Sequence, residues 1–349
     1  MARRKARMPQ GKKIQPAVKD IVFSLNVGGI GVTTDDYLDL SQVASIVNRR
    51  FYRQGLNWAV AGFDFFTNGP FTGEIGISKV PDTWVASNSW EKGFRAWQKM
   101  NNDALDEAES VRPRFLDFKV YMDAGHHAAG SAANLLPVTV AGLATPGEWE
   151  YSKYVVPFGP ASPGNTTDFD VIWTGANFPG AGATGADAVS LIEGYAASRG
   201  LPQILDPNAP ADAADADGST PENWLSALQN EGIDQDSEVL EDLISENNQA
   251  PYPYEGDGTA LDTQYPGGAN QMPGLQVFDT VRMSNTTVGA KAVIGGTNFQ
   301  GGLVKISNTP RQYTLPNGDQ TNAFGAVTMI VRLVPGQHRG YMCQSMTDV

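Results

Sequence analysis

The strongest predicted β-strand of the chain is Ala323-Phe324-Gly325-Ala326-Val327-Thr328-Met329-Ile330-Val331-Arg332-Leu333-Val334. It is rich in β-branched and aromatic residues, which fit the pleated, half-buried surface of a sheet. Further strands are predicted at residues 20–27, 56–66, 71–80, 115–122, 135–141, 169–173, 274–283 and 301–306. The 38 Gly and 22 Pro among the 349 residues supply turns between them. The sequence therefore predicts an all-β protein, a sandwich or a jelly roll with long loops.

Two of these strands are close neighbours along the chain and predict a β-hairpin. Residues 56–66 and 71–80 both alternate apolar and polar side chains, and Thr67-Asn68-Gly69-Pro70 joins them. Asparagine followed by glycine is typical of tight turns between antiparallel strands. We therefore expect these two segments to pair with each other.

Two other segments have helical spacing. Residues 40–47 place apolar side chains on one face behind Ser41, a favourable N-cap residue, and predict a short helix. Residues 87–108 predict a longer amphipathic helix, because large aromatic residues recur there every three or four positions. These aromatic residues are Trp90, Phe94 and Trp97. We expect the stripe to face the core; the alternative is a platform on which bases stack.

The composition changes sharply between residues 185 and 265, where 17 acidic residues accompany a single basic one, Arg199. Because this block interrupts a series of strands, we expect an insertion that projects outward from the body. The predicted organisation is a basic arm at 1–18, a sandwich domain formed by 19–180 and 270–349, and an acidic insertion of loops and short helices at 181–269.

The N-terminus carries the opposite charge. Six of the 25 Lys and Arg residues lie in the first thirteen positions, whereas all 38 Asp and Glu residues follow them. A basic arm neutralises phosphates whatever the base sequence, while the acidic body repels nucleic acid. The predicted phosphate-binding residues of the arm are Arg3, Arg4, Lys5, Arg7, Lys12 and Lys13. The alternative is a solubilising or targeting tail.

A second basic cluster interrupts the acidic body at Arg49-Arg50-Phe51-Tyr52-Arg53. It places three guanidinium groups within five residues, beside two aromatic rings. If the cluster and the arm open on the same side of the molecule, they form one cationic surface. The alternative is that Arg49, Arg50 and Arg53 pair with carboxylates of the body.

The sequence nominates no catalytic or metal-binding motif. The adjacent His126 and His127 would point to opposite sides of an extended chain, and no Cys/His cluster with zinc spacing accompanies them. The single cysteine, Cys343, excludes an internal disulfide and is interpreted as a packed residue. Asp215-Ala216-Asp217-Gly218 lacks the flanking acids of an EF-hand. We expect no enzyme activity, no cofactor and no metal site. The chain also has no apolar run of 18 residues, so no membrane partner is predicted.

Three short motifs, taken together with the arm and the strands, carry a resemblance to a known family. They are Asn48-Arg49-Arg50-Phe51-Tyr52-Arg53-Gln54-Gly55, Trp90-Glu91-Lys92-Gly93-Phe94-Arg95-Ala96-Trp97 and Val334-Pro335-Gly336-Gln337-His338-Arg339-Gly340-Tyr341. In this order they resemble the capsid proteins of small circular Rep-encoding single-stranded DNA viruses, and in particular the smacovirus-like branch. The acidic block lies where the loops of such capsids vary most.

The resemblance implies a single eight-stranded jelly roll of the viral capsid type, whose copies close into an icosahedral shell. It places the arm inside against the packaged single-stranded DNA, bound without regard to sequence, with Arg49, Arg50 and Arg53 lining the inner surface. It further implies a location in the virion, passage through the host nucleus during assembly and a host receptor of unknown identity. Many such capsids have longer arms, so cations or other surfaces must supply the remaining neutralisation.

Two other classes of function stay open from the residues alone. The first is a calcium-dependent β-sandwich binding module, such as a lectin or an adhesin, whose acidic loops hold the cation. The second is an enzyme whose carboxylates converge only in the folded chain. No secretory signal supports the first, and no acid/base pair can be nominated for the second.

Overall fold

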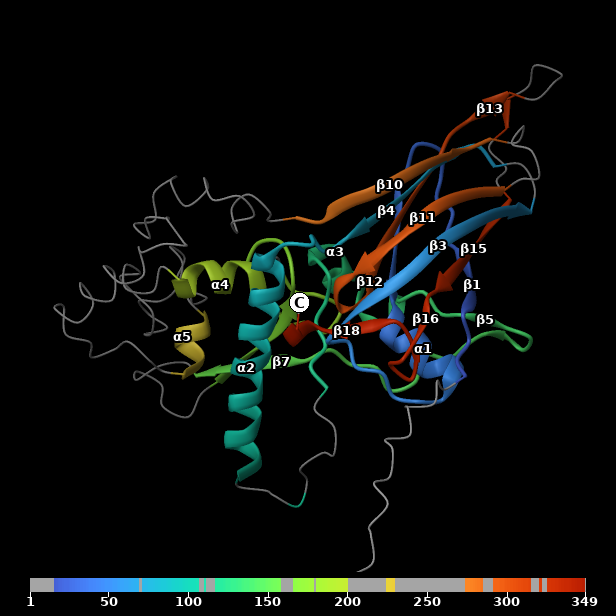
Figure 1. Cartoon of the computed structure of the whole chain (residues 1–349). Helices are drawn as coiled ribbons and strands as arrows, with labels where there is room; N and C mark the ends of the chain where they lie inside the picture. Colours follow the sequence, from blue (N-terminus) through green and yellow to red (C-terminus); the bar gives the residue numbers. More distant parts are fainter. Residues whose placement is uncertain are drawn as a thin grey trace, which may run out of the picture.

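The protein is built mainly from antiparallel β-strands, as predicted, with few helices (Figure 1). The computed structural model describes residues 16–68, 71–106, 110, 117–157, 166–178, 180–199, 224–229, 274–284, 291–314, 320–321 and 325–348. The arm residues Arg3, Arg4, Lys5, Arg7, Lys12 and Lys13 lie outside this part, as does most of the acidic block.

Two sheets face each other across the main core. The first has the strand order β1-β15-β3-β11, with β18 paired to the beginning of β3. Its strands are β1 (Asp20–Leu25), β15 (Ala326–Leu333), β3 (Leu56–Asn68), β11 (Lys291–Phe299) and β18 (Cys343–Ser345). The second has the order β10-β4-β12-β2. Its strands are β10 (Gln276–Met283), β4 (Gly73–Lys79), β12 (Leu303–Pro310) and β2 (Thr34–Asp39).

Pairing in these sheets is nested along the chain. Strand β1 pairs with β15, β2 with β12, β3 with β11 and β4 with β10, all antiparallel. The innermost pair is thus enclosed by the next, as in one long hairpin that has folded over on itself. Two further pairings, β15 with β3 and β12 with β4, complete the sheets.

Alternation along the strands explains why the two sheets pack together. In β15 and β12 every second side chain is buried, and the inward residues of both sheets form one apolar cluster. Phe23, Phe63, Ile77, Ile306 and Val331 are fully buried members of that cluster. Burial of each such side chain contributes roughly 1.5–3 kcal/mol, so the period-two pattern fixes which face of each strand turns inward.

The predicted pairing of residues 56–66 with 71–80 is wrong. The two segments form β3 and β4, but β3 belongs to the first sheet and β4 to the second. Each finds its partners among strands far away in the sequence, because the chain crosses from one sheet to the other between Asn68 and Gly73.

The described residues between β4 and β10 add a second layer with an apolar cluster separate from the main core. Its described strands pair only with one another: β7 (Lys153–Pro157) with β8 (Thr166–Ile172), β8 with β9 (Ala188–Ser190), and β5 (Val138–Thr139) with β6 (Gly142–Leu143). Its helices are α2 (Trp84–Asp106), α3 (Ala124–Ala129), α4 (Leu191–Arg199) and α5 (Trp224–Gln229). The two main sheets therefore take their strands from residues 20–79 and 276–345, a shorter first segment than the predicted 19–180.

Short elements complete the chain. They are α1 (Leu40–Asn48), β13 (Tyr313–Thr314), β14 (Gln320–Thr321), β16 (Pro335–Gly336), β17 (Gly340–Tyr341) and the 3-10 turns at Ser131–Ala133, Gln300–Gly302 and Met346–Asp348. The helix predicted at 40–47 is confirmed, but its N-cap is Asp39 and not Ser41. The Asp39 carboxylate accepts hydrogen bonds from the backbone N–H groups of Ser41 (2.9 Å) and Gln42 (3.3 Å).

Two further predictions are wrong, and a third is confirmed. The strand predicted at 115–122 is wrong in its described part, where residues 117–122 form only an isolated bridge from Tyr121 to Ile172. His126 and His127 do not lie on extended chain, because both belong to α3 and both are buried. The core-facing interpretation of the aromatic stripe on α2 is confirmed, since Trp90 is buried in the second core.

Candidate nucleic-acid interface

The described chain begins beside the predicted arginine cluster. Arg50 donates a hydrogen bond from Nη1 to the carbonyl oxygen of Pro16 at 3.3 Å. The N–H of Val18 donates to Oδ1 of Asn48 (3.0 Å), and the hydroxyl of Tyr341 donates to the carbonyl oxygen of Val18 (2.6 Å). Residues 16–18, the described end of the arm, are therefore fixed against the C-terminal end of α1. This end of the arm and the cluster lie at the same end of the sandwich.

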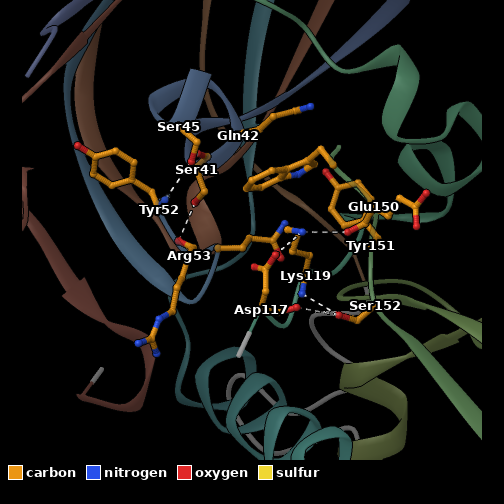
Figure 2. Close-up of polar contacts among 12 residues, drawn as sticks. Ser41, Gln42, Ser45, Tyr52, Arg53, Asp117, Lys119, Glu150, Tyr151 and Ser152 are labelled. Carbon is orange, nitrogen blue, oxygen red and sulfur yellow. Dashed lines mark hydrogen bonds and ion pairs between the residues drawn. The ribbon is translucent and has the colours of Figure 1, made fainter. Parts of the chain in front are cut away.

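The end of α1 sets the direction of two arginines. Arg49 caps the helix in the left-handed conformation, with φ 52° and ψ 42°, and its N–H donates to the carbonyl oxygen of Ser45. The following backbone is then tied to the same helix: Oγ of Ser45 accepts from the N–H of Tyr52 (3.0 Å), and Oγ of Ser41 donates to the carbonyl oxygen of Arg53 (2.9 Å). The side chains of Arg49 and Arg53 are exposed, and that of Arg53 points away from Asp117 and Lys119 (Figure 2).

A turn near the C-terminus brings another arginine to this place. The hydroxyl of Tyr52 donates to the carbonyl oxygen of Arg339 (2.9 Å), and Nη1 of Arg339 donates to the carbonyl oxygen of Phe51. Burial, followed by the charges of Arg339 and Arg53, lowers the pKa of the neighbouring His338. Arg339 is not among the phosphate-binding residues predicted from the sequence, because nothing local indicates that residues 338–341 pack on residues 51–52.

The alternative prediction is that these arginines pair with carboxylates of the body. The described residues show no such pairing for Arg49 or Arg53. Neither side chain forms an ion pair within the described ranges. The acid that Arg53 influences is Asp117. Burial raises the pKa of Asp117, and the hydrogen bond and charge of Lys119, with the charge of Arg53, partly offset that rise. The carboxylate of Asp117 is paired with Lys119, whose ammonium also lies 4.4 Å above the ring of Trp149.

A buried polar network holds the loop that carries Arg53. Nε2 of Gln54 donates to the Asp39 carboxylate (3.1 Å) and to the carbonyl oxygen of Val120 (3.0 Å), and the N–H of Val120 donates back to Oε1 of Gln54 (2.6 Å). Trp149 and Tyr151 of the second layer donate to the same carboxylate of Asp39. Burial raises the pKa of Asp39 to about 6, against these hydrogen bonds. The network joins the sandwich to the second layer directly behind the arginine cluster.

His126 continues this network. Its Nδ1 accepts a hydrogen bond from the N–H of Met122 (3.1 Å), so its Nε2 carries the proton and donates to Oδ1 of Asn134 (2.7 Å). Asn134 in turn donates to the hydroxyl of Tyr151 (3.0 Å) and to Gln42. Burial lowers the pKa of His126 to about 4. A second ring proton, on Nδ1, would face the Met122 N–H and would have no acceptor. Both nitrogens of His126 have structural partners.

The chemistry of this surface is electrostatic. Guanidinium groups bind phosphate oxygens in a forked geometry and carry no information about base sequence. The described residues contain no group of three or more His, Cys, Asp or Glu side chains that could hold a metal ion, and Asp215 and Asp217 lie outside them. Burial raises the pKa of Cys343 to about 12, so its thiol keeps its proton at neutral pH.

Comparisons with known proteins add nothing to this geometry. No protein-family model, curated protein or solved structure matches the chain. Among the helices that the structure describes, none has the length and apolar character needed to cross a membrane.

Proposed function

We propose that this chain is the coat protein of a small single-stranded DNA virus, which assembles into a closed shell and packages its genome through the basic arm. In this proposal the two facing sheets form a jelly roll. The nested pairing of β1 with β15, β2 with β12, β3 with β11 and β4 with β10 supports it, because eight strands paired in this way wrap as two Greek keys.

Genome binding rests on the junction between Pro16 and Arg50. The arm carries six positive charges in thirteen residues, and it joins the body beside the exposed Arg49 and Arg53. The point where the arm joins the body and two exposed arginines thus lie at one end of the sandwich, in a chain whose net charge is −13. A phosphate backbone is bound by such a surface through release of counterions, which requires neither a groove nor a base-reading helix.

The acidic insertion takes the opposite role in this proposal. Residues 185–265 carry nearly half of the acidic side chains of the chain and would repel phosphates. We place them on the outer surface of the shell, in contact with solvent or a host receptor. The proposed locations are the virion and, during assembly, the host nucleus.

Electron microscopy of the purified full-length chain, with sedimentation velocity, tests the assembly. Uniform closed particles are the expected result, in low to moderate salt and at rising protein concentration. A chain that sediments as a monomer over the whole range of salt, pH and nucleic-acid additions contradicts the proposal. A calcium-dependent monomer that binds sugars would favour the binding-module alternative instead.

A further inference from the structure

A polar cleft lies between the outer face of the second sheet and the second layer. Its volume is about 460 Å³, which is in the range of small-molecule sites. Polar side chains from both layers line it: Asp35, Ser78, Lys305 and Ser307 come from the sandwich, and Asp123 and Thr174 come from the second layer. These segments are far apart in the chain, so no local sequence pattern indicates the site.

The register of the second sheet places the sandwich side chains on one wall. Ser78 of β4 lies opposite Lys305 of β12, and Ser307 of β12 lies opposite Asp35 of β2. Residues directly opposite each other on paired strands point to the same face of a sheet. This face turns away from the main core, because Ile306, between the two polar residues of β12, is buried in that core. The wall is therefore fixed by strand pairing, and a ligand would find it already formed.

Lys305 connects the two walls. Its Nζ lies 3.0 Å from Oδ2 of Asp35 and donates to Oδ2 of Asp123 at 3.4 Å. The other oxygen of each carboxylate is also held, since Oδ1 of Asp35 accepts from Oγ of Ser307 (2.6 Å) and Oδ1 of Asp123 accepts from the N–H of His126 (2.8 Å). Burial lowers the pKa of Lys305, but the charge of Asp123 and the hydrogen bond to Asp35 outweigh this effect and raise it. Lys305 is therefore an ammonium group at neutral pH.

The groups that remain available to a ligand are mainly hydrogen-bond acceptors. Each carboxylate oxygen can accept two hydrogen bonds, so Asp35 and Asp123 keep unused acceptor sites. The side chain of Asp35 is 37% exposed, which makes it accessible from solvent. Within the described part of the chain, the hydroxyl of Ser78 has no hydrogen-bond partner. A ligand with several O–H donors would satisfy these groups.

The charges in the cleft exclude two other classes of ligand. Two carboxylates repel anions such as phosphate. Lys305 already supplies the positive charge that a metal ion or an amine would bring to these carboxylates, and it repels both. Hydrogen bonds from neutral hydroxyl groups to carboxylates are about twice as strong as those between neutral groups. An uncharged ligand rich in hydroxyl groups fits the cleft best.

We propose that this cleft binds a neutral sugar unit of a glycan, and that it does so without calcium. Every residue of the cleft belongs to one chain, so binding does not require assembly into a shell. Independence from calcium also distinguishes this site from the calcium-dependent binding module that the acidic loops would form.

A glycan array probed with the labelled full-length chain, in EDTA, tests the ligand class. The array carries glycans that end in neutral hexoses or N-acetylhexosamines, together with sialylated and sulfated glycans. Selective binding to neutral glycans is the expected result. The proposal is overturned if a folded chain binds no glycan, binds only the anionic ones or binds only when calcium is added. Spermidine that competes with the bound glycan more strongly than the free sugar does would assign the cleft to an organic cation instead.

Two substitutions in the cleft locate the binding site. Ser78→Ala should lower the affinity for the glycan about three- to tenfold, as loss of one hydrogen bond does, and should leave the stability of the protein unchanged. Asp35→Asn should lower the affinity about tenfold or more, because it removes a charged acceptor. The matched control is Asp279→Asn, which changes an exposed carboxylate of β10 outside the cleft. Calorimetric titration with the free oligosaccharide measures these affinities. Glycan binding that both cleft variants retain in full would place the site elsewhere.

Discussion

Arg50 holds the carbonyl oxygen of Pro16 at 3.3 Å, so the chain leaves the sandwich beside the arginine cluster at the end of α1. This hydrogen bond connects two features that are 34 residues apart in sequence. It places Pro16, where the described chain begins, beside the arginine cluster, as the proposed cationic surface requires.

Charge reversal of the two exposed arginines should weaken binding to single-stranded DNA. We expect the Arg49→Glu and Arg53→Glu double variant to bind with lower affinity and a smaller salt dependence. The slope of log K against log salt should fall by about 0.7 for each phosphate that the variant no longer neutralises. Fluorescence anisotropy with an oligonucleotide over a salt series measures both quantities.

The matched control for each of these substitutions, made singly as Arg49→Glu or Arg53→Glu, is Arg282→Glu on β10, which is exposed at the opposite end of the sandwich and changes the net charge by the same amount. Its affinity for the oligonucleotide should change much less, because Arg282 lies away from the junction of arm and cluster. An equal decrease in affinity in the control would show that only net charge matters.

Trp90 should act on stability and not on nucleic-acid binding. It is 4% exposed, and its ring stacks on Phe94 at 5.2 Å and meets Phe118 edge-on at 5.8 Å. Trp90→Ala should lower the free energy of unfolding by about 3–5 kcal/mol, as removal of a large core aromatic does. Chemical denaturation measures this change. A variant that keeps its stability but loses affinity for DNA would instead support the base-stacking platform.

His126 should make the protein less stable as the pH falls. Its pKa is about 4 in the folded protein, against 6.5 for the unperturbed group. Between these pH values His126 is protonated in the unfolded chain but not in the folded one, so acidification favours unfolding. The loss should approach about 3 kcal/mol at pH 4, since one pKa unit corresponds to roughly 1.4 kcal/mol. His126→Gln should remove this loss, as measured by urea denaturation at several pH values.

Asp39 should have the opposite dependence and serves as the internal control. Its pKa of about 6 lies above the ordinary 3.8, so its folded-state proton contributes stability below pH 3.8 that disappears as the pH rises to about 6. Asp39→Asn should therefore steepen the loss of stability on acidification, while His126→Gln flattens or reverses it. If the two variants have parallel pH profiles, the network around Asp39 and His126 does not titrate as described.

Much of the fold could be predicted from the sequence, because the alternation of apolar and polar residues in a strand shows which of its faces is buried. Segments such as β15 and β12 alternate inward and outward residues, and this period is visible without any partner. The alternation does not show which strands pair with each other, as β3 and β4 illustrate. Their short connection with the turn-like Asn68-Gly69 suggests a hairpin. The two strands instead lie in different sheets, where the apolar face of each is also buried in the core.

The candidate site was only half predictable for the same reason. Arg49, Arg50 and Arg53 are adjacent in sequence, so their cluster could be identified directly. Arg339 joins them only because Tyr52 binds its carbonyl oxygen across 287 residues, which no local pattern encodes. Asp39 was missed as the N-cap because Ser41 is an equally good capping residue two positions later.

The most direct measurement is the ratio of absorbance at 260 and 280 nm of purified particles, with and without residues 1–13. We expect the truncated chain to fold and to close into particles that carry no nucleic acid, so that the ratio falls to that of protein alone. An unchanged ratio in intact particles would contradict the role of Arg3, Arg4, Lys5, Arg7, Lys12 and Lys13 in holding the genome.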